Sequence, residues 1–422
     1  MYQVPRGTRD FPPDEMKKRR YVEENMKSTF NSFGYAEIQT PTFETLELFT
    51  AKSGNSIKDE IYDFTDKGNR ELALRPELTA PVIRFYVEKL QMEPKPLKLY
   101  YFGNCFRYDR PQKGRYREFQ QAGCEIIGTD TPEAHAELVA LAYNILENVG
   151  LKKIELNIGN LNILNYIFKK IGLSEDVKKE VLPLIDKLLF DDLSSLLSDN
   201  GIKKDDVTKL IELLQTSDSS KIKDFIKEDA NALEELSNLE QILYLLKKSF
   251  NIDNFQIKMS IVRSLDYYKG IVFEIDAPFL GAEKQLCGGG SYDLVKLFGG
   301  RETPTSGFAI GFDRTIIALE SEKYEFPITK TDVYIIPVNS DMIENVIEIA
   351  QKLRKEGHKV EFDLSRRGIG KSLKYANSKN SQYVIIIGPE ELEKDSVTLR
   401  DMNTGKQQLI KISELSSKLK NH

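Results

Sequence analysis

Tryptophan is absent from the 422 residues, and cysteine and histidine occur only three times each. The cysteines do not have the spacing of metal ligands, and so few of them fit a reducing cytoplasm. The histidines, His135, His358 and His422, are far apart in the sequence, which argues against a histidine-based zinc site. The chain also lacks a recognisable signal peptide and any apolar run long enough to span a membrane. We therefore expect a cytoplasmic protein that holds no metal of its own.

Charge of one sign does not dominate the sequence either. The formal net charge is −5, and the composition is ordinary for a globular protein. Any contact with nucleic acid must therefore use local basic patches rather than an overall positive field. The length is sufficient for about two or three domains.

The segment from Lys98 to Gly128 is predicted to form two strands joined by a basic, glycine-containing loop. Because side chains two residues apart on a strand share a face, the second strand places Phe119, Gln121, Gly123 and Glu125 together. Buried polar groups without partners are unfavourable. Gln121 and Glu125 therefore indicate a bound ligand, for which Gly123 would leave room.

The loop between these strands is strongly basic. Asp109 is its one acidic residue, and its basic residues are Arg107, Arg110, Lys113, Arg115 and Arg117. Guanidinium groups match phosphate oxygens well, so the loop is a candidate phosphate site. An ordinary hairpin with a solvated basic tip would have the same composition.

The sequence FRYDRPQKGRYREFQQAGCEIIG resembles motif 2 of the class II aminoacyl-tRNA synthetases, and it is similar to the version in the histidyl-tRNA synthetase family. Other pieces of that family follow in order: RGTRDF (6–11), LRPELTAP (74–81), RSLDYYKGIVFE (263–274), GGGSYD (288–293) and GFAIGFDR (307–314). RSLDYY is the most specific piece, because it separates the histidine enzymes from other class II members. The resemblance covers most of the chain outside about residues 161–250.

The resemblance implies an α+β fold with four segments. An antiparallel-sheet catalytic domain flanked by helices would comprise residues 1–160, with motifs 1 and 2, and residues 251–323, with the histidine motifs and motif 3. A helical insertion would occupy residues 161–250, whose apolar residues recur at helical spacing. Residues 328–422 would form an α/β anticodon-binding domain, in agreement with alternating strand and helix patterns there. Motif 1 builds a dimer interface in the family, which implies a homodimer.

The resemblance also assigns a histidine site to Glu77, Thr79, Gln121, Glu125, Tyr267 and Tyr268. Glu77 and Thr79 would bind the α-amino group, and Glu125 would hold the imidazole. From the residues alone, a carboxylate at position 77 could instead cap the helix that starts beside it. The two tyrosines could likewise be aromatic cover on a turn.

For ATP, the resemblance implies Arg107, Asp109, Arg115, Phe119, Arg263 and Arg314. Arg107 and Arg263 would be the catalytic pair that clamps the α-phosphate. Arg115 and Arg314 would hold the β- and γ-phosphates, and Phe119 would stack on adenine. Mg²⁺ would travel with ATP rather than with a protein cage. Arg110 and Gln112 would contact the acceptor end of tRNA.

The implied function is that of a ligase which activates L-histidine with ATP to histidyl-adenylate and pyrophosphate, and then transfers histidine to the 3′ end of tRNA(His). The alternative is a catalytically inactive, histidine-sensing paralogue that regulates histidine biosynthesis. Such paralogues typically lack the C-terminal domain and parts of the arginine set. This chain keeps both, which favours the enzyme. It departs from the usual family pattern at Leu78, Asp109 and Ser291.

Overall fold

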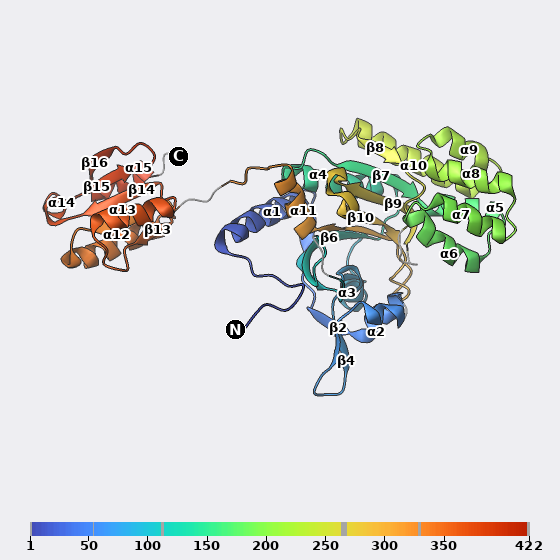
Figure 1. Cartoon of the computed structure of the whole chain (residues 1–422), viewed down its shortest axis with the longest axis horizontal. Coiled ribbons are helices and arrows are strands. Elements are labelled where there is room, and N and C mark those ends of the chain that lie inside the picture. The colour runs from blue at the N-terminus through green and yellow to red at the C-terminus, as the bar shows by residue number, and fades with distance from the viewer. Residues whose placement is uncertain (1, 54, 111–113, 263–267, 328–330, 420–422) are drawn as a thin grey trace. The chain divides into compact units, whose positions relative to one another are not determined.

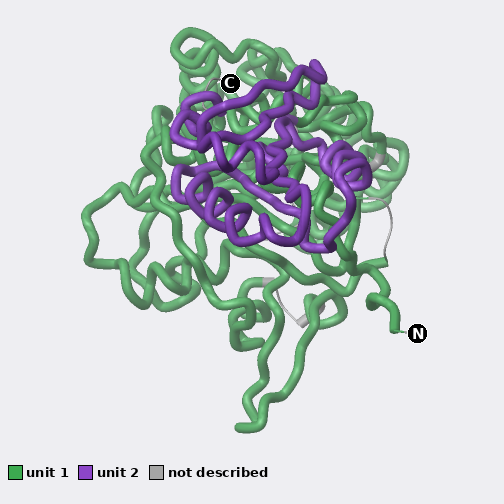
Figure 2. The backbone as a smooth tube through the Cα atoms, turned by 90° about the vertical axis from the view of Figure 1, so that its left-hand side faces the viewer, with its two compact units in different colours: residues 1–326 green, residues 327–422 purple. Residues whose placement is uncertain are grey.

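The computed structural model describes the whole chain except residues 1, 54, 111–113, 263–267, 328–330 and 420–422. The chain forms two compact units, residues 1–326 and 327–422 (Figure 2). Each unit has its own sheet, and the larger unit carries the segments that resemble synthetase motifs.

The first unit is built on an eight-stranded sheet in the order β1-β5-β6-β11-β10-β9-β7-β8 (Figure 1). The edge strands β1 (Ala36–Glu37) and β8 (Phe255–Ile257) pair in parallel with their neighbours. The inner strands are antiparallel: β5 (Leu97–Phe106), β6 (Glu118–Ile127), β11 (Thr305–Gly311), β10 (Gln285–Tyr292), β9 (Tyr268–Asp276) and β7 (Glu155–Asn160). The two strands predicted around the basic loop are β5 and β6.

Helices cover both faces of this sheet. On one face, α1 (Pro13–Ser32) and α4 (Pro132–Asn148) pack into the main core against Ala122 and Cys124 of β6. Thr131 caps α4 by accepting a hydrogen bond from the Ala134 amide. On the other face, α3 (Thr79–Phe85) and the π-helical turn η2 (Tyr86–Leu90) pack on β5 and Ile127. The helix α11 (Phe312–Ser321) follows β11 directly.

A small three-stranded sheet stands beside the main one. It consists of β2 (Phe43–Thr45), β4 (Glu71–Leu74) and β3 (Asp63–Thr65), and it packs near α2 (Leu46–Ser53) and η1 (Asn55–Asp59). The turn between β3 and β4 projects from the unit, as Figure 1 shows. β3 and β4 pair in antiparallel fashion and so form a hairpin around residues 67–69.

Six helices follow β7, as the periodicity of residues 161–250 predicts: α5 (Leu161–Lys170), α6 (Glu175–Asp186), α7 (Phe190–Asp199), α8 (Lys204–Gln215), α9 (Ser219–Ile226) and α10 (Ala230–Lys248). Their buried side chains are almost all Leu, Ile and Val. The chain then returns to the sheet through β8, so this helical group lies between β7 and β8. The short helix η3 (Pro278–Glu283) connects β9 to β10.

The second unit has a five-stranded mixed sheet in the order β13-β12-β14-β15-β16. Its strands are β12 (Val333–Pro337), β13 (Val360–Phe362), β14 (Tyr383–Ile387), β15 (Ser396–Asp401) and β16 (Gln407–Lys411). Its helices are η4 (Ser340–Met342), α12 (Ile343–Lys355), α13 (Ile369–Ser378), α14 (Pro389–Glu393), η5 (Ile412–Glu414) and α15 (Leu415–Leu419). The small α/β architecture predicted from the alternating patterns is confirmed.

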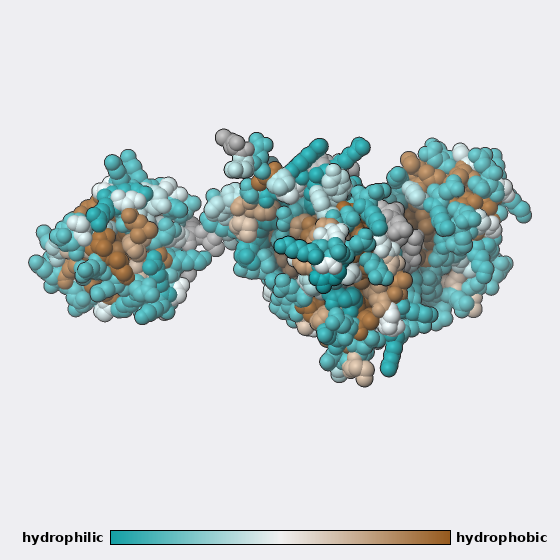
Figure 3. Space-filling model, turned by 90° about the horizontal axis from the view of Figure 1, so that it is seen from below, coloured by the Kyte–Doolittle hydropathy of each residue, from teal (hydrophilic) through white to brown (hydrophobic). Residues whose placement is uncertain are grey.

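The surface in Figure 3 is mostly hydrophilic, with smaller hydrophobic areas. Among the helices that the structure describes, none combines the length and the apolar character needed to cross a bilayer.

Candidate active site

A cavity of about 540 Å³ lies on the face of the main sheet that is turned away from α1 and α4. Strands β6, β9, β10 and β11, the start of α3 and the start of α11 contribute to its wall. The structure brings together in this wall most of the residues predicted for histidine and ATP: Glu77, Thr79, Arg107, Asp109, Arg115, Phe119, Gln121, Tyr268 and Arg314. Gln112, Arg263 and Tyr267 lie outside the described residues. Arg110 is exposed and does not line the cavity.

Alternation along β6 puts Phe119, Gln121, Gly123 and Glu125 on one face of the strand, as predicted, and Phe119 and Gln121 line the cavity. The expectation that Gly123 leaves room for a ligand is wrong. A Cβ atom at position 123 would lie 2.5 Å from the Phe308 carbonyl and 2.6 Å from the Tyr101 hydroxyl. Tyr101 faces Gly123 across the β5–β6 pair, so its ring uses the space. The glycine makes room for this tyrosine instead.

Glu125 does not line the cavity itself but lies behind its wall, opposite Gly307, and is 1% exposed. The Tyr101 hydroxyl donates a hydrogen bond to Oε1 at 3.0 Å, and the Tyr292 hydroxyl donates a short one to Oε2. Burial raises the pKa of the Glu125 carboxyl to about 8, although both hydrogen bonds act in the opposite direction. A carboxyl that can donate or accept a proton therefore lies beside two tyrosine hydroxyls, behind the part of the cavity wall that Tyr292 forms.

Glu77 has the capping role that its position allows. Its carboxylate accepts hydrogen bonds from the Thr79 amide at 2.6 Å and the Ala80 amide at 3.1 Å, at the start of α3. The buried Lys52 ammonium lies 3.0 Å from Oε1. Sequence analysis did not single out Lys52, because nothing in its local pattern indicates a partner 25 residues away. Glu77 also lines the cavity, so capping does not prevent contact with a substrate.

The arginines gather at the other end of the site. Nε of Arg107 donates to the Pro76 carbonyl at 2.9 Å, and its guanidinium lies 5.3 Å from the centre of the Phe119 ring. Arg314 donates to the carbonyls of Gly114 and Gln285. Burial lowers the pKa of Arg314. Guanidinium groups suited to phosphate oxygens thus line the cavity, and the buried Glu125 carboxyl lies behind its wall at Tyr292 and Gly307.

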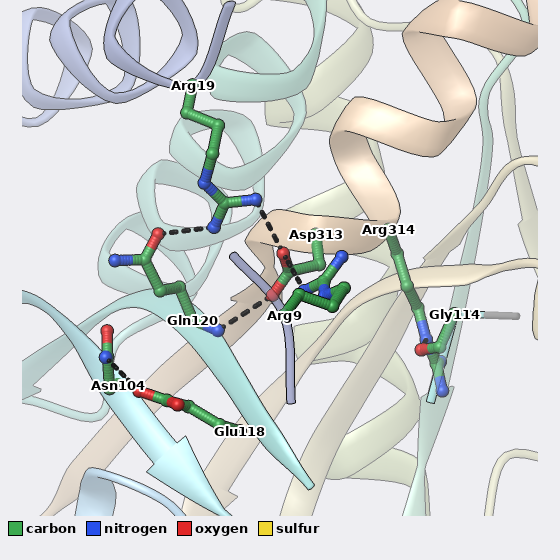
Figure 4. A network of polar contacts seen from close by, with 8 residues as sticks. All are labelled: Arg9, Arg19, Asn104, Gly114, Glu118, Gln120, Asp313 and Arg314. Carbon is green, nitrogen blue, oxygen red and sulfur yellow. Dashed lines mark hydrogen bonds and ion pairs between the residues drawn. The ribbon is translucent and has the colours of Figure 1, made fainter. Parts of the chain in front are cut away.

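A buried ion network fixes the strand and helix that carry these groups (Figure 4). Asp313 is 4% exposed and accepts hydrogen bonds from Arg9 at 2.6 Å, from Arg19 at 2.8 Å and from the Gln120 amide at 2.9 Å. Arg19 also donates to the Gln120 side chain at 2.7 Å. The network ties the N-terminal segment and α1 to β6 and α11. Asp313 precedes Arg314, and Gln120 follows Phe119, so the network positions two cavity residues.

Comparison with known proteins identifies this architecture. A family model described as histidyl-tRNA synthetase matches residues 7–315, and a model for an anticodon binding domain matches residues 332–422. The chain belongs to the histidyl-tRNA synthetase family. The predicted family and fold class are both confirmed.

Full-length relatives support the same assignment. A histidine–tRNA ligase of Methanocaldococcus jannaschii is 45% identical, with 99% of each chain covered, and one of Methanosarcina acetivorans is 44% identical, with 98% of each covered. The crystal structure of apo S. aureus histidyl-tRNA synthetase has a TM-score of 0.77 at 31% identity, with 100% of both chains covered.

A second cavity of about 210 Å³ lies behind the sheet of this family member, between α4, α10 and β9. Ser291 is 3.1 Å from Nε2 of His135, and Asp130 is 3.2 Å from the same nitrogen. Because both contacts meet at Nε2, this group is not a Ser–His–Asp relay, which uses both ring nitrogens. Elsewhere too, within the described ranges, no three His, Cys, Asp or Glu side chains form a group that could hold a metal.

The pKa of Glu125 predicts a pH-dependent stability. The carboxyl binds its proton more tightly in the folded chain (pKa about 8) than at its usual value of 4.5. The protonated carboxyl therefore contributes to the free energy of unfolding. This stabilisation is complete below about pH 4.5 and is lost as pH rises through about 8. Glu125→Gln cannot titrate. Between about pH 6 and 9 without histidine, we expect the melting temperature of the original chain to fall at least about 3 °C further than that of the variant. Parallel melting curves across this range would contradict the prediction.

Asp313→Asn should destabilise the first unit by about 2–3 kcal/mol, because two guanidinium groups lose their buried counter-ion while the hydrogen-bond geometry is largely kept. Urea unfolding, followed by a probe in that unit, would measure the loss. Glu320→Gln is a matched control. Its ion pair with Lys18 is 43% exposed on the glutamate side, so its removal should change stability by less than about 1 kcal/mol. Equal effects of the two substitutions would refute the role assigned to Asp313.

Proposed function

We propose that this chain is a histidine–tRNA ligase, which activates L-histidine with ATP to histidyl-adenylate and pyrophosphate and then transfers histidine to the 3′ end of tRNA(His). The observation that carries the proposal is the arginine-lined cavity whose wall residue Tyr292 is hydrogen-bonded to the buried Glu125 behind it. The full-length histidine–tRNA ligase relatives support the same reaction.

In this proposal the amino acid binds with its side chain toward Glu125. An imidazole both donates and accepts hydrogen bonds, which suits a carboxyl next to tyrosine hydroxyls. Gln121, Tyr267 and Tyr268 complete the imidazole pocket, and Glu77 with Thr79 holds the α-amino group. A site built on such hydrogen bonds rejects amino acids that cannot form them.

The α-carboxylate of histidine then attacks the α-phosphorus of ATP. The bond from that phosphorus to the bridging oxygen breaks, and pyrophosphate leaves. Arg107 and Arg263 clamp the α-phosphate, and Arg115 and Arg314 hold the leaving phosphates. The adenine base stacks on Phe119 beside Asp109. Catalysis here is positioning and electrostatic stabilisation, with no covalent intermediate on the protein. Mg²⁺ enters bound to the phosphates of ATP and neutralises part of their charge.

The second step needs the acceptor end of tRNA at the same site. Arg110 and Gln112 are proposed to contact it, and the exposure of Arg110 is compatible with a contact to a large partner. The second unit, residues 327–422, would bind the anticodon. We also propose a homodimer through the region of motif 1, which includes α1.

Histidine-dependent exchange of pyrophosphate into ATP tests the proposal. All standard amino acids would be screened, and Arg263→Ala would be assayed in parallel. We expect exchange with histidine alone and its loss in the variant. Tight histidine binding without exchange would point to the histidine-sensing paralogue. Exchange with another amino acid would show that the pocket around Glu125 is misassigned.

A further inference from the structure

Glu283 places a negative charge between two arginines of the phosphate end. It is the last residue of η3, and its side chain is 15% exposed. One carboxylate oxygen is 3.0 Å from Nε of Arg115, and the other is 2.5 Å from Nη2 of Arg314. Both arginines line the cavity. Three sequence segments that are far apart therefore meet in one arginine–glutamate–arginine bridge.

The contacts of Arg314 show what this carboxylate does in the ligand-free protein. Nε donates to the Gly114 carbonyl at 3.2 Å, and Nη1 donates to the Gln285 carbonyl at 3.1 Å. These two neutral contacts fix the plane of the guanidinium. Nη2 meets the carboxylate, which is an anionic oxygen acceptor like a phosphate oxygen. Glu283 therefore has the contact that a phosphate group would make with this nitrogen.

Electrostatics favours such an anion in the absence of nucleotide. Arg107, Arg115 and Arg314 all line one cavity, and each of the first two disfavours the charged form of Arg314. Burial acts in the same direction. A carboxylate between Arg115 and Arg314 offsets this repulsion and keeps both side chains facing the cavity. A triphosphate brings several negative charges to the same groups and would compete with the carboxylate for them.

We propose that Glu283 is a positioning residue, a built-in counter-ion that holds Arg115 and Arg314 for the phosphates and is displaced from Arg314 when they bind. This proposal rests on the proposed function, because it assigns those phosphates to ATP. This counter-ion role and a supporting role for Glu283 predict opposite changes in phosphate affinity when the carboxylate is removed. A counter-ion competes with phosphate, so its removal strengthens phosphate binding. A tether for η3 or a ligand for nucleotide-bound Mg²⁺ supports binding, so its removal weakens it.

The test is the binding of inorganic tripolyphosphate, measured by calorimetry without Mg²⁺ or histidine. Glu283→Gln keeps the size of the side chain and removes its charge. We expect it to bind tripolyphosphate about five- to tenfold more tightly than the original chain. In exchange assays the KM for ATP should fall by a similar factor, while the KM for histidine stays within about twofold. Glu302→Gln, an exposed acid that does not line the cavity, is the control for net charge and should change neither value by more than about twofold.

Unchanged or weaker tripolyphosphate binding by Glu283→Gln would overturn the proposal. The Arg115→Gln background provides a second, independent test. With one of the two cations absent, the effect of Glu283→Gln should shrink to about twofold or less, and an undiminished effect would also overturn the proposal. If Glu283→Gln does not fold, Glu283→Asp, whose shorter carboxylate is withdrawn from Arg314, should still tighten binding at least about twofold. Tighter tripolyphosphate binding without any histidine-dependent exchange would refute the proposed function and leave the counter-ion role intact.

Discussion

Gly307→Ala should reduce histidine binding and histidine-dependent exchange at least about a hundredfold. Gly307 lies on β11 directly opposite Glu125 of β6. A Cβ atom at position 307 would lie 1.7 Å from Oε2 of Glu125 and 2.4 Å from the Cys124 carbonyl oxygen. No rotamer change at residue 307 can avoid this, because a Cβ position is fixed by the backbone. Because β11 is hydrogen-bonded to β6 on one side and to β10 on the other, the strand cannot move away from Glu125. The Glu125 carboxyl must therefore give up its hydrogen bonds with the two tyrosine hydroxyls.

Histidine affinity would be measured by calorimetry, and tripolyphosphate affinity would show whether the phosphate end is intact in the variant. Ser306→Ala is a matched control, because residue 306 neighbours Gly307 on the same buried strand but faces the opposite side of the sheet. It should leave histidine affinity within about twofold. If Gly307→Ala kept histidine affinity within about threefold of the original, Glu125 could not be the group that holds the imidazole.

Local periodicity and motif content were sufficient to predict much of this site. The alternation of Phe119, Gln121 and Glu125 identified the cavity face of β6, because residue spacing on a strand determines its faces. Alternating strand and helix patterns predicted the α/β architecture of the second unit, because local residue spacing also distinguishes strands from helices. Helical periodicity predicted the helices of residues 161–250. Each of these features depends on neighbouring residues in the sequence.

The rest of the site depends on contacts between distant segments. Tyr101 fills the space at Gly123, and that follows from the β5–β6 register rather than from either residue alone. Arg9 and Asp313 are 304 residues apart, and their charges gave no indication of pairing. Glu283 is one acid among many in the sequence. One signal was available for Asp313: an acid directly between an apolar strand and Arg314 requires a partner if it is buried.

Arg107→Ala should lower the rate of exchange by about a hundred- to a thousandfold, or roughly 3–4 kcal/mol in activation free energy, by analogy with the loss of one preorganised donor to a developing negative charge. Its Nε is held by the Pro76 carbonyl, and its guanidinium lies beside Phe119 in the cavity wall. The group is thus positioned before the substrate arrives. Histidine affinity should stay within about threefold, because Glu125, which we propose to hold the histidine side chain, lies six residues along β6 from the Phe119 ring that Arg107 contacts.

Arg107→Lys separates charge from geometry. Lysine keeps the positive charge but lacks the planar fork that contacts two phosphate oxygens, so we expect it to recover at most about tenfold of the lost rate. Arg70→Ala, which removes an exposed arginine and its local ion pair with Asp66, controls for net charge and should change the rate less than about twofold. The loss must appear in kcat rather than in the KM for histidine. A loss confined to the KM for histidine would mean that Arg107 binds the amino acid and does not stabilise the transition state.

Together with Gly307→Ala, the result also separates the enzyme from a histidine sensor. In a sensor, Gly307→Ala would abolish binding, but Arg107→Ala would have no exchange activity to remove.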